Sequence, residues 1–336
     1  MTTPALAPLF SSPSPEISFS SGARSLPLAA IDWLGEHGFL QPEPRSPLAF
    51  WRELGRRSGQ TARHAAGVDL VRRGFVRADW SPEVRRRRLL SSGPLGEALA
   101  VLERPEVRLR VGVGRPDGPA QIAELYIAGE RATLGVLEGD VLQIGPAFTV
   151  EALIDSLADE LATRGAPESF VLWPMLYRLT TALWSNGEGG AGEVLSPDVL
   201  RAQATSAEAA DELSAQMLDA GVVEGDIASG LRLTQAYRRW LAPMWSGSVF
   251  ELERREIERQ PDEDATERSC LFVGPPGQRI LCEELSSTEA LGDPTMVWPE
   301  ESLLMLSALS RQEVRGRLAD LVAPGRAQRS ACAVVH

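Results

Sequence analysis

Lysine is absent from this sequence of 336 residues, so all 34 basic residues are arginine. A P-loop needs a lysine on the nucleotide phosphates, which excludes nucleotide hydrolysis of the Walker type. Protein kinases, Schiff-base aldolases and pyridoxal-phosphate enzymes also depend on a lysine and are excluded for the same reason. Histidine occurs three times, at His37, His64 and His336, which is too few for a histidine-rich metal centre. We therefore expect no metal site and no cofactor.

Cysteine is equally scarce, with three residues at Cys270, Cys282 and Cys332. Three cysteines cannot form a disulfide framework, and they fit a reducing compartment. The segment from Met1 to Leu26 lacks a basic region followed by an apolar run, so the sequence predicts no signal peptide. No window approaches the roughly 18 consecutive apolar residues of a transmembrane helix. We expect a cytoplasmic protein without a membrane span.

The chain is acidic, with 46 acidic residues against 34 basic ones, a net charge of −12 and a pI near 4.9. This balance disfavours a general nucleic-acid binder, because contacts to phosphate dominate that affinity. Hydrophobic residues make up 43% of the chain, which is ordinary for a globular protein. The length favours two domains or one large domain with two lobes.

The first part of the chain predicts an α+β unit. Residues 1–24 are rich in serine and proline and predict a disordered arm. Over 107–113 (VRLRVGV) apolar and charged residues alternate, which is typical of a half-buried strand. The first α+β half spans 25–165 and has the following expected elements: helices at 26–40, 47–76 and 94–103, strands at 107–113, 122–127, 132–137 and 141–144, and a closing helix at 149–163.

The second part of the chain predicts the same order of elements. A helical spacer at 166–206, with a helix at 170–184 and a glycine-rich linker, precedes a second half at 207–325 and a tail at 326–336. The expected elements of the second half are helices at 207–220 and 231–242, strands at 248–257, 269–273, 279–285 and 296–298, and a helix at 301–322. We interpret this order as an internal duplication. The predicted fold is α+β, with two pseudo-repeated halves, each an antiparallel sheet of three or four strands packed by helices. Two unrelated α+β lobes would give the same pattern.

A run of four arginines forms a candidate anion patch, made of Arg85, Arg86, Arg87 and Arg88. The order helix, turn, helix, strands is also that of a winged helix, whose arginines contact DNA phosphates. The alternative is a solvated face that neutralises acidic surroundings, and the net charge favours this alternative.

Nothing in the sequence marks a catalytic centre. The chain has no Gly-x-Ser-x-Gly elbow, and no histidine lies close in sequence to Cys270 or Cys282. These two cysteines flank a Gly-Pro-Pro-Gly turn almost symmetrically and could face each other across a hairpin; two reduced core thiols are the alternative. We predict no catalytic residue. An enzyme with scattered catalytic residues would instead show a deep polar pocket with displaced pKa values.

Three consecutive segments carry a resemblance to a known family: Leu70–Val76 with its helix-ending glycine, Leu95–Pro105, and the start of an alternating strand at Glu106–Val111. With the two pseudo-repeated halves, they resemble the EspG family over about 45–163 and more loosely over 207–323. Members of that family are cytosolic chaperones associated with type VII (ESX) secretion. Each holds a helical secretion substrate in soluble, monomeric form and does no chemistry. The resemblance implies an adaptor that masks an apolar helical tip.

The predicted function is therefore a non-enzymatic cytoplasmic chaperone or adaptor that holds a helical protein partner in a secretion-type system. A sheet offers such a partner an edge or a face. We predict that the partner contacts the second sheet and its hairpin, through Phe250, Leu252, Phe272, Ile280 and Trp298. The alternative function is a tandem winged-helix regulator that binds DNA.

Overall fold

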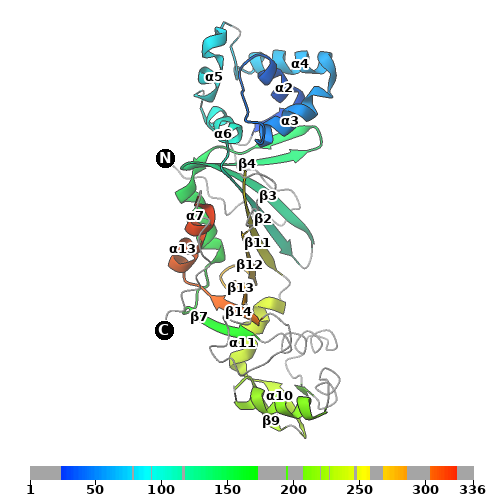
Figure 1. Cartoon of the computed structure of the whole chain (residues 1–336), viewed down its shortest axis with the longest axis vertical. Coiled ribbons are helices and arrows are strands. Elements are labelled where there is room, and N and C mark those ends of the chain that lie inside the picture. The colour runs from blue at the N-terminus through cyan, green and yellow to red at the C-terminus, as the bar shows by residue number, and fades with distance from the viewer. Residues whose placement is uncertain are drawn as a thin grey trace.

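The molecule is elongated, with a helical cap at one end, a large sheet in the middle and a small lobe at the other end (Figure 1). The computed structural model describes residues 24–77, 79–91, 93–115, 118–172, 194–195, 207–219, 221–226, 228–245, 248–257, 268–285 and 303–323. No helix among these residues is long and apolar enough to cross a membrane.

Five helices form the cap: α2 (Leu28–Glu36), α3 (Pro47–Arg56), α4 (Gly59–Arg72), α5 (Pro82–Leu90) and α6 (Pro94–Glu103). The single helix expected at 47–76 is two helices, α3 and α4. Gly59 has φ +78°, a left-handed conformation that glycine adopts without strain, and it redirects the chain between them. Ser46 caps the start of α3 by accepting a hydrogen bond from the backbone N–H of Ala49 at 3.1 Å.

A buried carboxylate joins three of the cap helices. Asp32 on α2 has no exposed surface, and it accepts hydrogen bonds from Arg52 on α3 at 3.3 Å and from Arg63 on α4 at 3.0 Å. A buried charge is tolerated only where it is paired in this way. Through these hydrogen bonds Asp32 holds α2 against both α3 and α4.

One antiparallel sheet of eleven strands runs through the described residues. Its order is β1-β5-β4-β3-β2-β11-β12-β13-β14-β7, and β6 also pairs with β4. The strands are β1 (Arg24–Pro27), β2 (Val107–Arg115), β3 (Gly118–Ala128), β4 (Arg131–Glu138), β5 (Val141–Ile144), β6 (Phe148–Thr149), β7 (Glu168–Leu172), β11 (Val249–Glu256), β12 (Arg268–Val273), β13 (Ile280–Leu285) and β14 (Leu303–Ala308). The expectation of two separate sheets of three or four strands is wrong, because β2 pairs directly with β11 from Val107 to Gly114.

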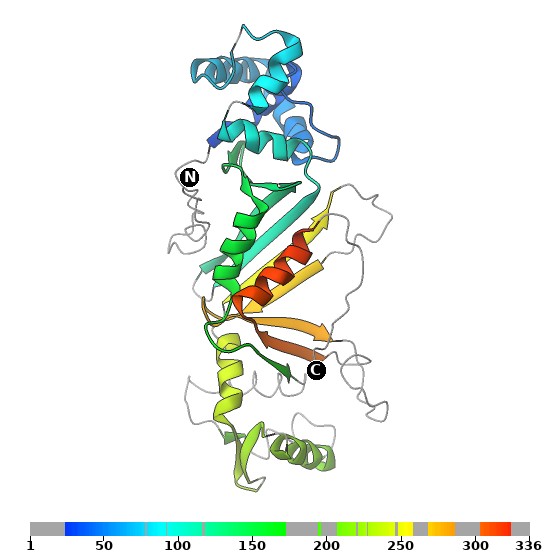
Figure 2. The same cartoon turned by 90° about the vertical axis from the view of Figure 1, so that its left-hand side faces the viewer.

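Two helices cover one face of this sheet: α7 (Val150–Leu161) and α13 (Arg311–Val322). They lie side by side on it, as Figure 2 shows. Thr149 caps α7, and Ser310 forms a capping box with Glu313 at the start of α13. Alternate side chains of the strands, such as Leu109 and Leu252, are fully buried against these helices. This layer is the main core.

The far lobe holds α10 (Ala207–Asp219) and a small sheet in the order β8-β10-β9. Its strands are β8 (Val194–Leu195), β9 (Val223–Asp226) and β10 (Gly230–Leu233). Helix α11 (Gln235–Trp245) leads from β10 back to the large sheet and packs against β13. There the ring of Phe170 on β7 meets Tyr237 edge-on, with the centroids 4.7 Å apart, and stacks on Trp240.

Four of the expected helices begin as strands. The helix expected at 26–40 begins in β1, and α2 starts only at Leu28. The segment expected as a helix at 170–184 begins inside strand β7, and its remainder lies outside the described residues. The segment 231–242 begins in β10, and 301–322 divides into β14 and α13. Short apolar runs fit a buried strand as well as a buried helix, so periodicity alone does not separate them. The arm up to residue 23, the strand expected at 296–298 and the tail 326–336 lie outside the described residues.

Candidate protein-binding face of the sheet

The face of the sheet opposite α7 and α13, on the right in Figure 1, is covered at its two ends. At the cap end Tyr126 is 3% exposed and packs edge-on against Trp51, with ring centroids 5.9 Å apart. At the other end α11 packs against β13, and Ile280 is buried. On the strands between these ends, β3, β2, β11 and β12, the described outward side chains other than Tyr126 and Val273 are partly or largely exposed. We call the outward side of these four strands the open face.

One row of residues crosses the centre of the open face. The register pairs Ile122 on β3 with Gly112 on β2, Gly112 with Glu251 on β11, and Glu251 with Leu271 on β12. Directly paired residues of neighbouring strands point to the same side of a sheet, so these four form a central row. Ile122 is 43% exposed and Leu271 is 39% exposed. Ile122 and Leu271 are therefore two large, exposed apolar side chains in the same row, although their strands are far apart in the sequence.

Charged residues flank the central row in ion pairs between strands. Arg108 pairs with Glu124 at 2.7 Å, and Arg110 pairs with Glu253 at 3.2 Å. All four side chains are partly exposed, so each pair adds less than about 1 kcal/mol to stability. Both pairs lie on the same side of the central row, toward Val107, and they place neutralised charge beside it.

Two glycines keep the middle of the open face flat. A Cβ added to Gly112 would lie 3.6 Å from Glu251 Cβ, and one added to Gly114 would lie 3.5 Å from Val249 Cβ. Both distances are ordinary van der Waals contacts, so packing within the chain leaves room for a side chain at each position. The strand β2 thus presents bare backbone between Ile122 and β11.

The residues predicted to contact a partner are placed in the interior. Phe250, Leu252 and Phe272 are 2% exposed or less and pack in the core under α7 and α13. Ile280 is 4% exposed and lies on the α11 side of the sheet, while Trp298 lies outside the described residues. The accessible surface of these strands is made instead by the alternate residues. Sequence reasoning missed Ile122 and Leu271, although strand alternation, once the buried side is known, identifies them.

The candidate anion patch of four arginines is split by the fold. Arg86 forms an ion pair with Glu103, which is 1% exposed. The Nη2 of Arg86 donates to Oε2 of Glu103 at 2.7 Å, and its Nε donates to the same oxygen at 3.1 Å. This hydrogen-bonded pairing with Glu103 raises the pKa of Arg86. Arg85 donates to the backbone oxygens of Trp80 at 3.2 Å and His37 at 3.1 Å.

Arg85 and Arg86 are therefore bonded to groups within the cap. Arg87 and Arg88 are the two members that are exposed to solvent. Binding of a phosphate there stays a prediction, and it now rests on these two side chains.

Cys270 and Cys282 do not face each other across the hairpin, which was one of the two arrangements that the sequence left open. Cys270 pairs in register with Leu252, on the α7 and α13 side, whereas Cys282 pairs with Leu271, on the open face. The two thiols therefore lie on opposite sides of the sheet, and both are free. Burial raises the pKa of Cys282 to about 12 and, together with nearby Glu283, raises that of Cys270. Neither is an activated nucleophile at neutral pH.

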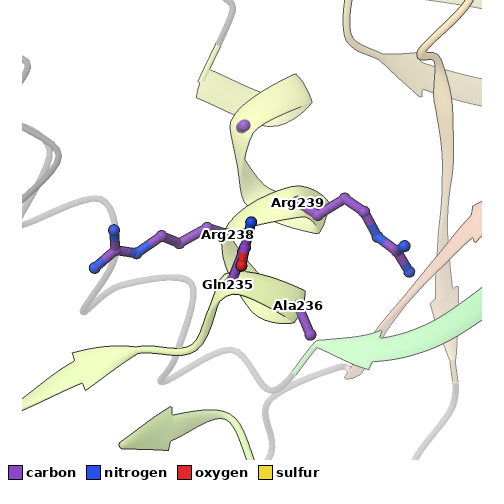
Figure 3. Close-up of a pocket in the computed structure, with 5 residues that line it drawn as sticks. Gln235, Ala236, Arg238 and Arg239 are labelled. Atoms are coloured by element: carbon purple, nitrogen blue, oxygen red, sulfur yellow. The ribbon is translucent and has the colours of Figure 1, made fainter.

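A hollow of about 560 Å³ lies beside α11, lined by Gln235, Ala236, Arg238, Arg239 and Ala242. Figure 3 shows Arg238 and Arg239 leaving the helix in opposite directions. Arg239 ion-pairs with Glu168, and Arg238 donates to the backbone oxygen of Leu233 at 3.1 Å. The two cations do not converge on a common point. In the described part of the chain, no three His, Cys, Asp or Glu side chains gather to hold a metal ion.

Comparison with known proteins gives likenesses at the level of structure alone. No protein-family model matches the chain, and no curated protein matches it. Among solved structures, the chain is similar to the type VII secretion system chaperone EspG5 of Mycobacterium tuberculosis, solved in complex with a PE25–PPE41 dimer. The identity is 12% and the TM-score 0.43, over 90% of this chain and 96% of that one. That protein belongs to the EspG family, which is the family that the sequence resembles.

Proposed function

We propose that this chain is a non-enzymatic chaperone or adaptor that holds a helical protein partner against the open face. The observation that carries the proposal is the central row, in which Ile122 and Leu271 stand exposed on either side of a flat glycine position. Exposed apolar side chains that gather on one surface mark sites of interaction with other proteins. A helix with an apolar stripe is the partner that fits a flat row of this kind.

The surroundings of the row support the same function. Inter-strand ion pairs border it, so a partner that settles on the row need not desolvate an unpaired charge at the Arg108 and Arg110 positions. The secretion-type setting is proposed from the sequence resemblance to the EspG family. The cytoplasmic location is proposed from the scarcity of cysteine.

We also propose that the two halves arose by duplication. Helix α6, strands β2 to β5 and helix α7 come in this order in the first half, with the two-residue strand β6 before α7. Among the described residues, α11, β11 to β14 and α13 come in the same order in the second half. The first strands of the two sets, β2 and β11, pair antiparallel at the centre of the sheet. An approximate twofold axis between them would relate the two sets, and α7 would correspond to α13.

The test is capture of the partner by the full tagged chain from a nuclease-treated extract of the source cells. The wild-type chain is compared with the double variant Ile122→Asp/Leu271→Asp and with Val68→Asp. Val68 is a matched control because it is 54% exposed on α4, away from the sheet. We expect wild type and Val68→Asp to retain the same helical protein in stoichiometric amount, and the double variant to lose it while remaining folded. The proposal would be refuted if the double variant retained the partner protein as well as wild type does. It would also be refuted if wild type captured only nucleic acid from an untreated extract and nothing from the nuclease-treated one.

A further inference from the structure

The central row contains one carboxylate, that of Glu251. Glu251 is exposed, and its register neighbours are Gly112 on one side and Leu271 on the other. Its Oε2 lies 3.6 Å from the point that a Cβ on Gly112 would occupy. The carboxylate therefore lies over the bare backbone of β2, between Ile122 and Leu271.

This carboxylate differs from the others on the open face. Glu124 and Glu253 are held by Arg108 and Arg110. No arginine among the described residues forms an ion pair with Glu251. A partner that covers the row would take this charge out of water, and an unpaired buried carboxylate is costly. A cation supplied by the partner removes that cost.

We infer that the partner of the open face places an arginine or lysine on Glu251, between two apolar side chains that contact Ile122 and Leu271. This inference rests on the proposed function and adds the chemistry of the partner. An apolar side chain at the position of the cation would leave Glu251 buried and unpaired, and an acidic one would also repel it. Glu251 therefore determines specificity, whereas Ile122 and Leu271 provide the contact area.

The strand spacing sets the spacing of the three contacts. Neighbouring strands lie about 4.8 Å apart, so Ile122 and Leu271, three strands apart, are separated by about 14 Å, with the carboxylate about 5 Å from Ile122. A helix rises about 1.5 Å per residue, so a helix that crosses the strands covers these distances in about 3 and 9–10 residues. Positions i, i+4 and i+11 lie within about 40° of one line along a helix, at rises of about 6 and 16.5 Å, and are the closest match to this spacing. The expected pattern is apolar at i, basic at i+4 and apolar at i+11.

Binding of designed helical peptides to the full chain tests this inference. One host sequence carries leucine at i and i+11 and arginine, glutamine or glutamate at i+4, and fluorescence anisotropy reports the dissociation constant. For the wild-type chain we expect the arginine peptide to bind about fivefold more tightly than the glutamine peptide, the upper end for a partly exposed ion pair. The glutamate peptide should bind more weakly than both.

Variants of the chain separate this inference from the proposed function. Glu251→Gln should abolish the preference for arginine, and Glu251→Arg should reverse it in favour of the glutamate peptide. Ile122→Ser, which removes the apolar contact without adding charge, should weaken all three peptides alike. If wild type binds all three peptides equally and Ile122→Ser abolishes that binding, the inference is wrong while the proposed function stands. If no peptide binds wild type, the inference is also overturned, and the capture experiment decides the proposed function on its own.

Discussion

Replacement of Arg86 by glutamine should destabilise the cap, although this residue belongs to a run of arginines that resembles a solvated face. The guanidinium holds Glu103, a carboxylate with 1% of its surface exposed. The glutamine side chain is shorter and uncharged, so the carboxylate would remain buried without its cation. The neighbouring arginine, Arg87, is exposed and provides a matched control.

The magnitude follows from the burial of the two partners. Removal of one partner of a fully buried ion pair costs about 3–5 kcal/mol. The Arg86 side chain is 34% exposed, so water can reach the carboxylate after the substitution and offset part of this cost. We expect Arg86→Gln to lower the free energy of unfolding by about 2 kcal/mol, in the range for a hydrogen bond to a charged group. Arg87→Gln should change it by less than about 0.5 kcal/mol.

Urea unfolding followed by tryptophan fluorescence measures both changes, because Trp33, Trp51 and Trp80 report on the cap. Urea is preferred to guanidinium, which screens ion pairs. A third variant, Arg86→Met with Glu103→Leu, removes both charges and should recover much of the lost stability, since apolar replacement of a buried pair is often neutral. Equal midpoints for Arg86→Gln and Arg87→Gln would refute the reasoning.

Two further predictions concern the backbone and the thiols. A Cβ on Gly67 would overlap the ring of Trp33, so Gly67→Ala should lower the free energy of unfolding by about 1–3 kcal/mol. Gly112 has room for a methyl group, so Gly112→Ala should change this free energy by less than about 0.5 kcal/mol. Comparable losses for the two variants in urea unfolding would contradict this. Burial raises the pKa of Cys282 to about 12, so little thiolate forms at pH 8 and alkylation there should be slow, becoming faster only as pH rises toward that value. Mass spectrometry of time points with iodoacetamide measures the rate, and rapid labelling at pH 8, or a disulfide to Cys270 after mild oxidation, would show the placement to be wrong.

Local patterns predicted the strands better than the helices. The strand expected at 141–144 has those bounds in the structure, and the alternation over 107–113 lies within β2, because both signals are contained in a few consecutive residues. Helix α5 was missed because it has a single buried residue, Leu89, and thus no apolar stripe. Its start is marked instead by Pro82 at the first helical position and Glu83 in the first turn.

The central pairing and the open face could not be read from local patterns. The pairing of β2 with β11 joins residues from the two halves, and no periodicity specifies which strands become neighbours. The choice of partner-binding residues failed for a related reason. The apolar character of Phe250 and Phe272 fits a contact surface as well as a core, and α7 and α13 cover their side of the sheet. Which residues are exposed depends on where α7 and α13 pack, and that is set by the tertiary fold.

The pairing of β2 with β11 also has a consequence for synthesis of the chain. β2 begins at Val107 and β11 at Val249, so at about 5–20 residues per second the ribosome completes β11 roughly 7–30 s after β2. During that interval the nascent first half has no partner for one edge of β2. An unpaired strand edge is a template for association with other chains. A polysome that carries many such half-finished chains would bring their β2 edges close together, so factors that shield the nascent chain are expected to matter more for this protein than for one whose sheet closes within each half.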